Sequence, residues 1–181
     1  MLTVIDGGRD PHSKWPEIVV AERYAPPFAV GARVLPDDTY GVLAADTVVR
    51  EPAAHPVRIL TEAHDTPEAA GGSTTWEPTG AHQPWRVRVV VHDLARQPSW
   101  RRQWIADGLD AVFAGCRERG IDALALPLLG SVHGRLPRPE AVELICEALL
   151  RSQAPARLWI VVDRGWEEAV RTEFALVLDG A

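Results

Sequence analysis

The stretch Ile121–Pro137, with the sequence IDALALPLLGSVHGRLP, decides how this chain folds. Its apolar run at residues 123–126 is typical of a strand that is buried on both faces. The run ends at Pro127, a short loop with small residues follows at 128–134, and a helix is expected to begin at Pro137. In open α/β sheets, ligands bind beyond the carboxyl ends of such strands, where backbone N–H groups can hold a phosphate. A tight connection that binds nothing explains a loop of this length equally well.

The composition indicates one domain with a sizeable core and argues against several classes of partner. The chain has 181 residues, 46% of them hydrophobic, and a formal net charge of −6. Lys14 is the only lysine and the arginines are scattered, whereas nucleic-acid binding needs a clustered basic surface. The sequence contains neither an apolar run long enough to span a membrane nor a signal-peptide layout. We therefore expect a single cytoplasmic domain over residues 1–181, with no nucleic-acid or membrane partner and no indication of its oligomeric state.

The cysteines and histidines form no pattern for a disulfide or a metal. Cys116 and Cys146 both fall on apolar stripes of expected helices, which favours reduced thiols in the core. Four histidines are widely spaced in expected loops, without the spacing of zinc ligands: His12, His55, His64 and His82. We expect no metal site, and no motif indicates a cofactor.

Strands and helices are expected along much of the chain. The expected strands are residues 2–5, 17–24, 40–45, 86–93, 123–126 and 157–162. The expected helices run from an N-cap at Ser99 to Gly120, from Pro137 to about Ser152, and from Trp166 to Leu176. Residues 36–38 (Pro-Asp-Asp) have turn chemistry, residues 28–34 are ambiguous, and residues 64–83 are expected to form long surface loops. From residue 86 onward the alternation predicts a mainly parallel sheet with helices on both faces.

The order of motifs from Arg86 onward resembles that of the macro domains, α/β/α modules that bind ADP-ribose. The corresponding pieces are VVVHD (89–93), the helix after Ser99, LALPLLGSVHGRLP (124–137) and RLWIVV (157–162). Pro127 and Pro137 stand at the separation found in the family's phosphate loop. Upstream, GVLAADT (41–47) is similar to the family's Ile-Val-Asn-Ala-Ala-Asn segment. The resemblance implies a three-layer α/β/α fold with a mixed, mostly parallel sheet and helices on both faces, in which residues 1–40 are divergent strands and loops.

The resemblance also implies where a ligand binds. The phosphate loop and the upstream segment supply the expected contacts: Leu129, Gly130, Ser131, Val132, His133, Gly134, Ala45 and Asp46. Arg135 and Arg138 flank the loop and fit either a phosphate clamp or ordinary solvated side chains. The expected ligand is ADP-ribose or a related nucleotide.

Departures from the family's pattern argue against its standard chemistry. Leu43 and Asp46 stand where the upstream segment has its two asparagines, and the second of these supports hydrolysis in the glycohydrolase members. The Asp46 carboxylate accepts a hydrogen bond from a ribose hydroxyl but repels a nearby diphosphate. Val132 replaces a glycine of the loop, although a β-branched residue is poorly suited to positive φ. No clear acidic residue for the adenine is present, so we expect nucleotide binding without standard glycohydrolase activity.

Two alternatives remain open. An atypical ADP-ribosyl hydrolase or phosphatase would use Asp46 and His133, because an imidazole acts as an acid or a base near neutral pH. His133 is otherwise an ordinary loop histidine that bonds to a neighbouring carbonyl. A degenerate macro fold that serves as a protein-interaction domain is the other alternative, so the sequence leaves open whether the protein is an enzyme.

Overall fold

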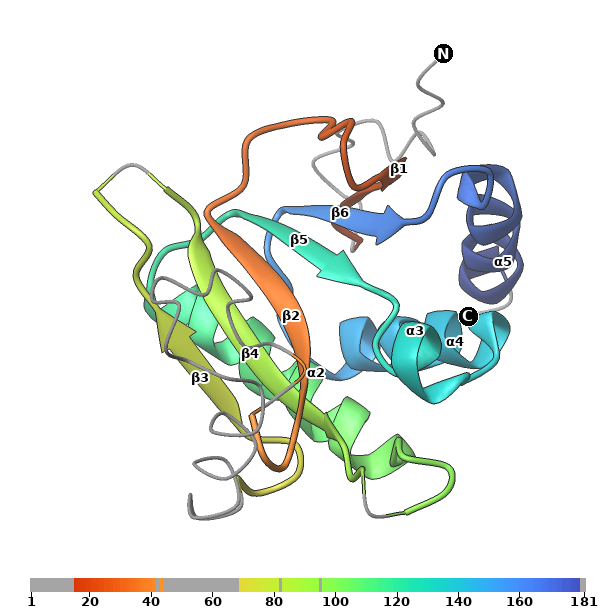
Figure 1. The fold of residues 1–181 in the computed structure, drawn as a ribbon. Coiled ribbons are helices and arrows are strands. Elements are labelled where there is room, and N and C mark those ends of the chain that lie inside the picture. Colours follow the sequence, from red (N-terminus) through yellow and green to blue (C-terminus); the bar gives the residue numbers. More distant parts are fainter. Residues whose placement is uncertain (1–14, 42, 44–68, 82, 95, 180–181) are drawn as a thin grey trace.

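The computed structural model describes residues 15–41, 43, 69–81, 83–94 and 96–179, whose strands form one six-stranded sheet (Figure 1). The strands, in chain order, are β1 (Glu17–Glu22), β2 (Ala32–Asp38), β3 (Thr74–Glu77), β4 (Trp85–His92), β5 (Ala123–Pro127) and β6 (Arg157–Val162). The helices are α2 (Arg102–Glu118), α3 (Ser131–Gly134), α4 (Arg138–Arg151) and α5 (Glu167–Asp179). The strand expected at residues 2–5 lies outside the described residues.

The sheet has the order β1-β6-β5-β2-β4-β3, and every neighbouring pair is parallel except β3 and β4. The five parallel strands therefore end at the same edge of the sheet, which we call the carboxyl edge. The connection through α4 is the helical crossover that the parallel neighbours β5 and β6 require, and α2 leads from β4 to β5, which pair with β2 from either side. The expected mixed, mostly parallel sheet of an α/β fold is confirmed.

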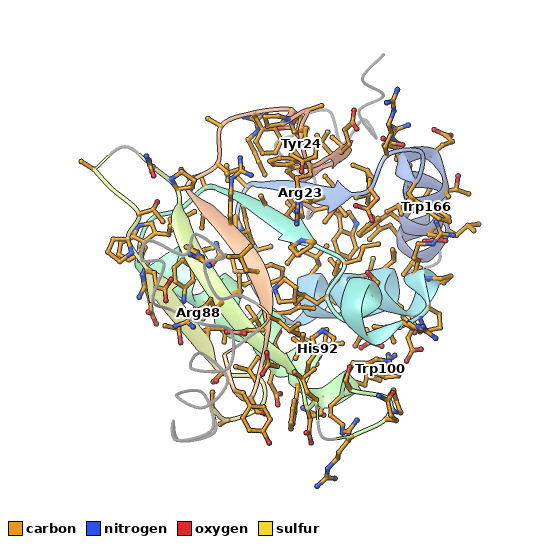
Figure 2. All side chains as sticks on the ribbon, in the orientation of Figure 1. Arg23, Tyr24, Arg88, His92, Trp100 and Trp166 are labelled. Atoms are coloured by element: carbon orange, nitrogen blue, oxygen red, sulfur yellow. The ribbon has the colours of Figure 1, made fainter. Side chains whose placement is uncertain are left out.

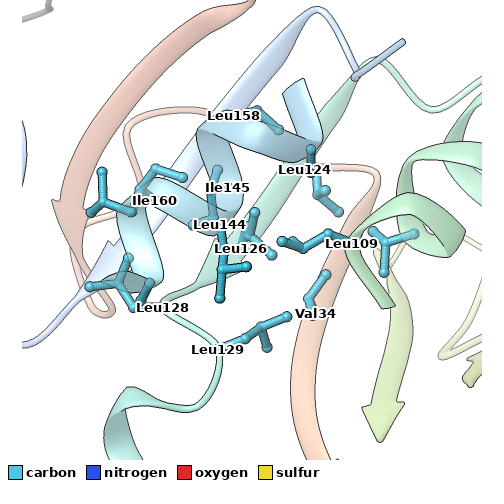
Figure 3. Close-up of a cluster of buried hydrophobic side chains, with 14 of the residues drawn as sticks. Val34, Leu109, Leu124, Leu126, Leu128, Leu129, Leu144, Ile145, Leu158 and Ile160 are labelled. Carbon is cyan, nitrogen blue, oxygen red and sulfur yellow. The ribbon is translucent and has the colours of Figure 1, made fainter. Parts of the chain in front are cut away.

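The main core lies between the sheet and helices α2, α4 and α5. Figure 1 shows α2 and α4 behind the sheet, and their apolar stripes meet the buried side chains of the strands. At the centre of this core (Figure 3), Leu124 and Leu126 of β5 are fully buried together with Leu144 and Ile145 of α4. The continuous apolar run that predicts β5 is thus explained by its central place in the sheet.

The opposite face of the sheet has its own cluster. Trp159 of β6 is fully buried there with Ala21 and Ala125, and its indole N–H donates to the Ala21 carbonyl at 3.1 Å. Phe28 and Val30, in the connection from β1 to β2, pack against this cluster. Successive side chains of β5 and β6 therefore pack on alternate faces of the sheet, as in strands that are buried on both sides.

Both cysteines lie in the main core as free thiols, as the sequence predicts. Burial raises the pKa of Cys116 to about 12, and the nearby Arg119 opposes this shift only in part. Burial also raises the pKa of Cys146 to about 12, with a smaller contribution from neighbouring glutamates on α4. Neither thiol is a nucleophile near neutral pH.

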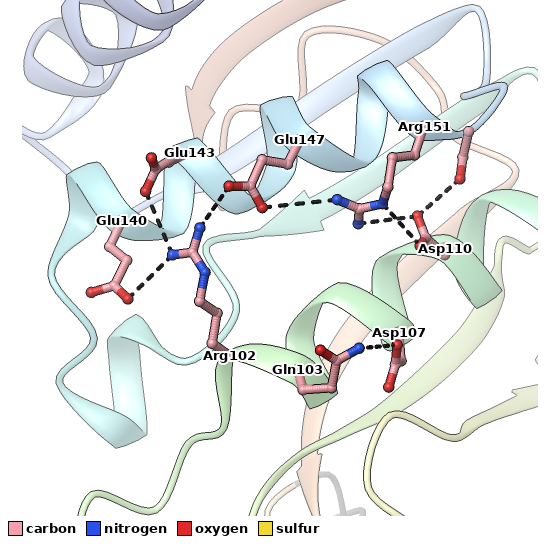
Figure 4. A network of polar contacts seen from close by, with 9 residues as sticks. Arg102, Gln103, Asp107, Asp110, Glu140, Glu143, Glu147 and Arg151 are labelled. Carbon is pink, nitrogen blue, oxygen red and sulfur yellow. Dashed lines mark hydrogen bonds and ion pairs between the residues drawn. The ribbon is translucent and has the colours of Figure 1, made fainter.

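Arg102 joins the first turn of α2 to one face of α4 (Figure 4). Its guanidinium is shared by three carboxylates at 2.6 to 3.5 Å: Glu140, Glu143 and Glu147. Burial alone would lower the pKa of Arg102, but the attraction of these carboxylates, Glu147 first, raises it overall. The two helices are therefore linked by charge at the solvent side as well as by apolar packing beneath.

The expectations for residues 36–45 are wrong where the structure describes them. Residues 36–38 do not form a turn but end the central strand β2, and the turn follows at Tyr40, Gly41 and Leu43 instead of the expected strand. β2 pairs with β4 along its whole length but with β5 only at residues 32–33. Pro36 has no N–H to donate, but it lies beyond the residues of β2 that pair with β5. It therefore removes no hydrogen bond from the β2–β5 pairing.

Two further expectations, the cap of α2 and the loop region at residues 64–83, are wrong. Ser99 does not cap α2, whose N-cap is Arg101; the Ser99 hydroxyl instead lies 3.0 Å from Nδ1 of His92, in a hydrogen bond. The region expected to hold only loops contains β3, which pairs with β4 and whose Trp76 packs against the main core. The expected end of α2 at Gly120 is confirmed, because that residue adopts a φ of 62° just after the C-cap.

Candidate functional site

The loop after β5 turns at Gly130, whose φ of 81° lies in the left-handed region that favours glycine. The chain then makes the single helical turn of α3 and closes where the Leu136 N–H donates to the Gly130 carbonyl at 3.1 Å. Ser131 fastens the start of the loop, since its N–H and its hydroxyl donate to the Leu128 carbonyl at 3.1 and 2.6 Å. The segment expected to bind a phosphate is therefore a closed loop at the carboxyl edge.

Three of the expected contact residues differ in what they offer a ligand. The Leu129 side chain is 1% exposed and belongs to the main core (Figure 3), so only its backbone is available to the loop's outer side. Gly130 supplies the turn rather than a functional group. The Ser131 hydroxyl donates its proton within the loop, which leaves its oxygen as an acceptor.

Gly134 places α3 directly on two aromatic rings. A Cβ atom at this position would lie 2.7 Å from Cδ1 of Trp100 and 2.9 Å from Cε1 of His92. His92 ends β4 and is 1% exposed, and Figure 2 shows it beside Trp100 at the carboxyl edge. The rings of His92 and Trp100 therefore pack directly against the backbone of α3 at Gly134.

The remaining expected contacts are less defined. The backbone of Val132 and His133 belongs to α3, but their side chains lie outside the described part of the structure. Ala45 and Asp46 also lie outside the described residues. The two candidate catalytic side chains, those of Asp46 and His133, are therefore not placed relative to each other.

A cavity of about 230 Å³ opens beside this loop, at the carboxyl ends of β5 and β6. Its apolar lining comes from the end of each strand and from the closing residue of the loop: Pro127, Leu128, Leu136, Val161 and Val162. The first strand of the chain reaches the same place, because β1 pairs with β6 in parallel. A concave apolar floor at the carboxyl edge is the usual setting of a ligand site in an open α/β sheet.

Polar groups and one aromatic ring form the rim of this cavity. The polar lining residues are Arg23, Ser131, Arg138 and Asp163, and Trp166 lies beside them. Figure 2 labels Arg23, which follows β1, and Trp166, which precedes α5. The rim therefore offers two guanidinium groups as donors and one carboxylate as an acceptor.

Arg138, at the first position of α4, is held by an aromatic ring and a distant carboxylate. Its Cζ lies 3.7 Å from the centroid of the Trp166 ring, a cation–π contact. Its Nη2 lies 3.9 Å from Oε1 of Glu173, at the limit of an ion pair. Its Nη1 is buried and donates to no acceptor among the described residues. Arg138 thus lines the cavity, while its Nη1 is covered by protein and has no surface open to a ligand there.

The carboxylates at the end of β2 are engaged in structure. Asp38 is fully buried and accepts hydrogen bonds from the N–H groups of Tyr40 and Leu43, each at 2.7 Å. Asp37, also buried, lies 3.6 Å from Arg88. Within the described residues no group of three or more His, Cys, Asp or Glu side chains could hold a metal ion.

Arg23, Asp163 and Trp166 are absent from the contacts expected from the sequence. One signal could have pointed to them, because each lies within a few residues of the end of β1 or β6 and therefore at the carboxyl edge. Arg138 was expected only as a residue flanking the loop.

None of the described helices is long and apolar enough to cross a membrane.

Comparison with known proteins identifies the fold. No protein-family model matches the sequence, and no curated protein matches it. Among solved structures, the macro domain of Thermus aquaticus DarG is 24% identical, with a TM-score of 0.56 over 80% of this chain and 96% of that chain. An Oceanobacillus iheyensis macro domain solved with ADP is 13% identical, with a TM-score of 0.63 over 90% of each chain.

A third likeness extends over more of the chain. The macro domain of ganglioside-induced differentiation-associated protein 2 is 11% identical, with a TM-score of 0.64 over 97% of this chain and 92% of that chain. Identities this low concern the fold alone. The resemblance seen in the sequence is thus confirmed at the level of structure: this chain has the fold of the macro domains.

Proposed function

We propose that this protein binds ADP-ribose or a related nucleotide along the carboxyl edge of its sheet, without standard glycohydrolase activity. The observation that carries this proposal is the cavity at the ends of β5 and β6, which adjoins the loop that turns at Gly130. A base or ribose enters the apolar cavity, and the phosphates lie toward the loop, where the small residues Gly130 and Ser131 allow close approach to the backbone.

Charge supports the same orientation. Arg23 and Arg138 line the cavity, and a guanidinium group binds phosphate through paired hydrogen bonds. Asp37 and Asp38, which would repel a diphosphate if free, are buried and bonded within the protein. A macro domain of the same fold was solved with ADP, and a variant of it with ADPR, which makes a diphosphate nucleotide the natural first ligand to test.

Isothermal titration calorimetry with ADP-ribose, AMP and NAD tests the proposal. We expect micromolar binding of at least one of them by the full chain. Gly130→Ala should weaken that binding at least tenfold, because a Cβ there would meet Ile105 at 2.9 Å and strain a φ of 81°.

Gly120→Ala is the matched control. It places a methyl group at a φ of 62° with nothing within 4 Å, far from the loop at the end of α2. Gly120→Ala should lose only the stability that the left-handed φ costs a methyl-bearing residue, and it should keep full nucleotide binding. Absence of heat at millimolar concentrations of every nucleotide would refute the proposal.

The absence of hydrolysis needs a separate assay. The protein is incubated with an ADP-ribosylated protein substrate, and released ADP-ribose is measured. We expect none above background. Release that disappears in the Asp46→Asn and His133→Ala variants would instead establish the atypical hydrolase.

A further inference from the structure

We propose that His92 is a positioning residue for nucleotide binding: its ring and that of Trp100, which together we call the α3 support, fix the loop that receives the phosphates. The inference rests on the proposed function, because it names what gives that loop its binding shape. Three observations carry it: the fixed ring of His92, the close approach of Gly134, and the backbone conformation of Arg135.

The ring of His92 is held in one place (Figure 2). Its Nδ1 lies 3.0 Å from the Ser99 hydroxyl, in a buried hydrogen bond. Its backbone is fixed as well, because the His92 carbonyl accepts from the Thr39 N–H at 3.0 Å and His92 forms a β-bridge with Trp100. The side chain is buried in a close-packed interior and has little room to change rotamer. His92 is therefore a rigid part of the α3 support.

Gly134 brings the backbone of α3 closer to the α3 support than any other residue type would allow. A Cβ atom there would lie 2.7 Å from Trp100 and 2.9 Å from His92, about 1 Å short of ordinary contact between carbon atoms. Both obstacles are ring atoms, and Trp100 packs against the main core. A larger residue at this position would therefore displace α3 rather than the two rings.

The residue after Gly134 shows that this approach has a cost in backbone strain. Arg135 has a φ of 57°, a conformation that favours glycine. It is the only non-glycine residue with a positive φ in the part of the chain that the structure describes. The chain thus places its glycine against the α3 support and retains the left-handed conformation at an arginine. Retained strain of this kind is concentrated at functional sites.

The position of α3 determines the position of the whole loop. The loop is closed on both sides of α3, by the hydrogen bond from Leu136 to Gly130 and by the bonds from Ser131 to Leu128. A displacement of α3 is therefore transmitted to the backbone N–H groups of the loop. Groups that bind a ligand must be held within about 0.5 Å of their productive positions. His92 thus acts on phosphate binding through the loop, without touching the ligand.

Titration calorimetry with ADP and the full chain tests the inference. Gly134→Ala should weaken ADP binding at least about tenfold, the loss expected when one hydrogen bond to a charged group is broken. Circular dichroism and thermal melting identify a temperature at which every variant is fully folded, so that a loss of stability does not enter the measured Kd.

Gly115→Ala is the matched control. Its methyl group would also meet a tryptophan ring, that of Trp76 at 2.4 Å, and it lies in a helix as Gly134 does. Gly115 is about 15 Å along α2 from Ile105, the residue of α2 that lies against Gly130. Gly115→Ala should therefore lose stability through the same kind of contact and bind ADP as the unmodified chain does.

Two substitutions at Ser99 assign the effect to His92. Ser99→Ala removes the hydrogen bond that fixes the imidazole and should weaken ADP binding about 2- to 10-fold, the range for one buried hydrogen bond. Ser99→Thr keeps the hydroxyl and should restore binding. His92→Ala removes the ring itself and should weaken ADP binding by at least as much as Ser99→Ala.

The outcomes separate this inference from the proposed function. If the unmodified chain binds ADP and folded Gly134→Ala binds it equally well, the α3 support does not position the loop and nucleotide binding stands. Equal losses in Gly134→Ala and Gly115→Ala overturn the inference too, because the loss is then not specific to the loop. If Gly134→Ala does not fold, unchanged binding by Ser99→Ala overturns the role of His92. No binding of any nucleotide by the unmodified chain refutes the proposed function and, with it, this inference.

Discussion

Asp38 ends the central strand with a buried carboxylate that organises the following turn through two hydrogen bonds of 2.7 Å. Asp38→Ala should lower the free energy of unfolding by about 2–4 kcal/mol, because two partly buried N–H groups lose a charged acceptor. Asp38→Asn should lose less, since one acceptor oxygen remains. Urea denaturation measures both. A change below about 0.5 kcal/mol for the alanine variant, the range of ordinary surface substitutions, would contradict this account.

The two buried thiols predict a specific dependence on pH. Their pKa of about 12 in the folded protein lies above the ordinary value of 9.0, so the folded state keeps the protons that the unfolded chain releases first. This contribution to stability is complete below pH 9 and is lost as the pH rises from about 9 to 12.

Thiol labelling checks the same assignment at fixed pH. At pH 8 in native buffer, a thiol reagent should label Cys116 and Cys146 only as fast as the protein opens, and in 6 M guanidinium chloride at once. Cys116→Ala and Cys146→Ala variants identify which thiol is labelled. Rapid native labelling of either one would show that it is accessible, contrary to its burial in the core.

Single residues show why the candidate site is only partly readable from the sequence. The spacing of prolines and small residues marks the loop at 127–137, because a tight strand-to-helix loop needs them locally. Arg23 and Asp163 are marked in the sequence only by their position just after two strands, and no motif surrounds them. They gain meaning only through the pairing of β1 with β6, which joins segments about 140 residues apart and leaves no periodic trace in the sequence.

At the scale of elements, α2 lies close to the sheet because it presents glycine to it. A Cβ at Gly108 would lie 2.4 Å from Cγ1 of Val89, a fully buried residue of β4. Gly108→Ala should therefore lower stability by about 1–2 kcal/mol, although alanine favours a helix by up to about 1 kcal/mol over glycine. For a chain of this size this corresponds to a fall in Tm of roughly 2–8 °C.

A double-mutant cycle tests the cause of this loss. Val89→Ala removes the atom that the new methyl group would meet, so the double variant Gly108→Ala with Val89→Ala should be more stable than additivity predicts. Additive effects would show that Val89 is not the obstacle. An increase in stability for Gly108→Ala alone would show that the helix can shift away from β4.

The elements themselves were predictable to different degrees. β5 and β6 contain continuous apolar runs, and β4 contains one at residues 89–91; central parallel strands produce such runs and few other structures do. β2 lacked this mark, because its second half is Leu-Pro-Asp-Asp, and these residues favour turns when taken alone. They are strand residues here because β4 pairs with them along the whole length and the β5 ladder stops at residue 33.

At the scale of the whole molecule, the sheet should differ in stability from its centre to one edge. β3 is a four-residue edge strand with half-buried and exposed side chains, whereas β5 lies between two parallel neighbours. Native-state hydrogen exchange should therefore be at least about tenfold slower in β5 and β6 than in β3. Mass spectrometry of peptides covering 74–77 and 123–127 measures this, and equal protection would contradict it.

The overall architecture also limits what sequence alone could reveal about function. The alternation of strands and helices predicted the parallel sheet, and with it a ligand edge, from residue 86 onward. It could not say which side chains line that edge, because Arg138, Asp163 and Trp166 converge only when α4, β6 and α5 are assembled. The lining of the cavity is thus a property of the assembled edge.

The sharing of Arg102 by three carboxylates has a consequence for how the protein tolerates mutation. Glu140, Glu143 and Glu147 occupy successive turns of α4 and duplicate one another, so the loss of any one leaves two partners for the same cation. Glu147 also pairs with Arg151 at 3.8 Å, but no other cation is placed beside Glu140 and Glu143 among the described residues, so loss of Arg102 would leave these two like charges uncompensated on one helix face. Substitution of any one of the three glutamates should therefore be tolerated, whereas substitution of Arg102 should be tolerated less, because several acceptors depend on one cation.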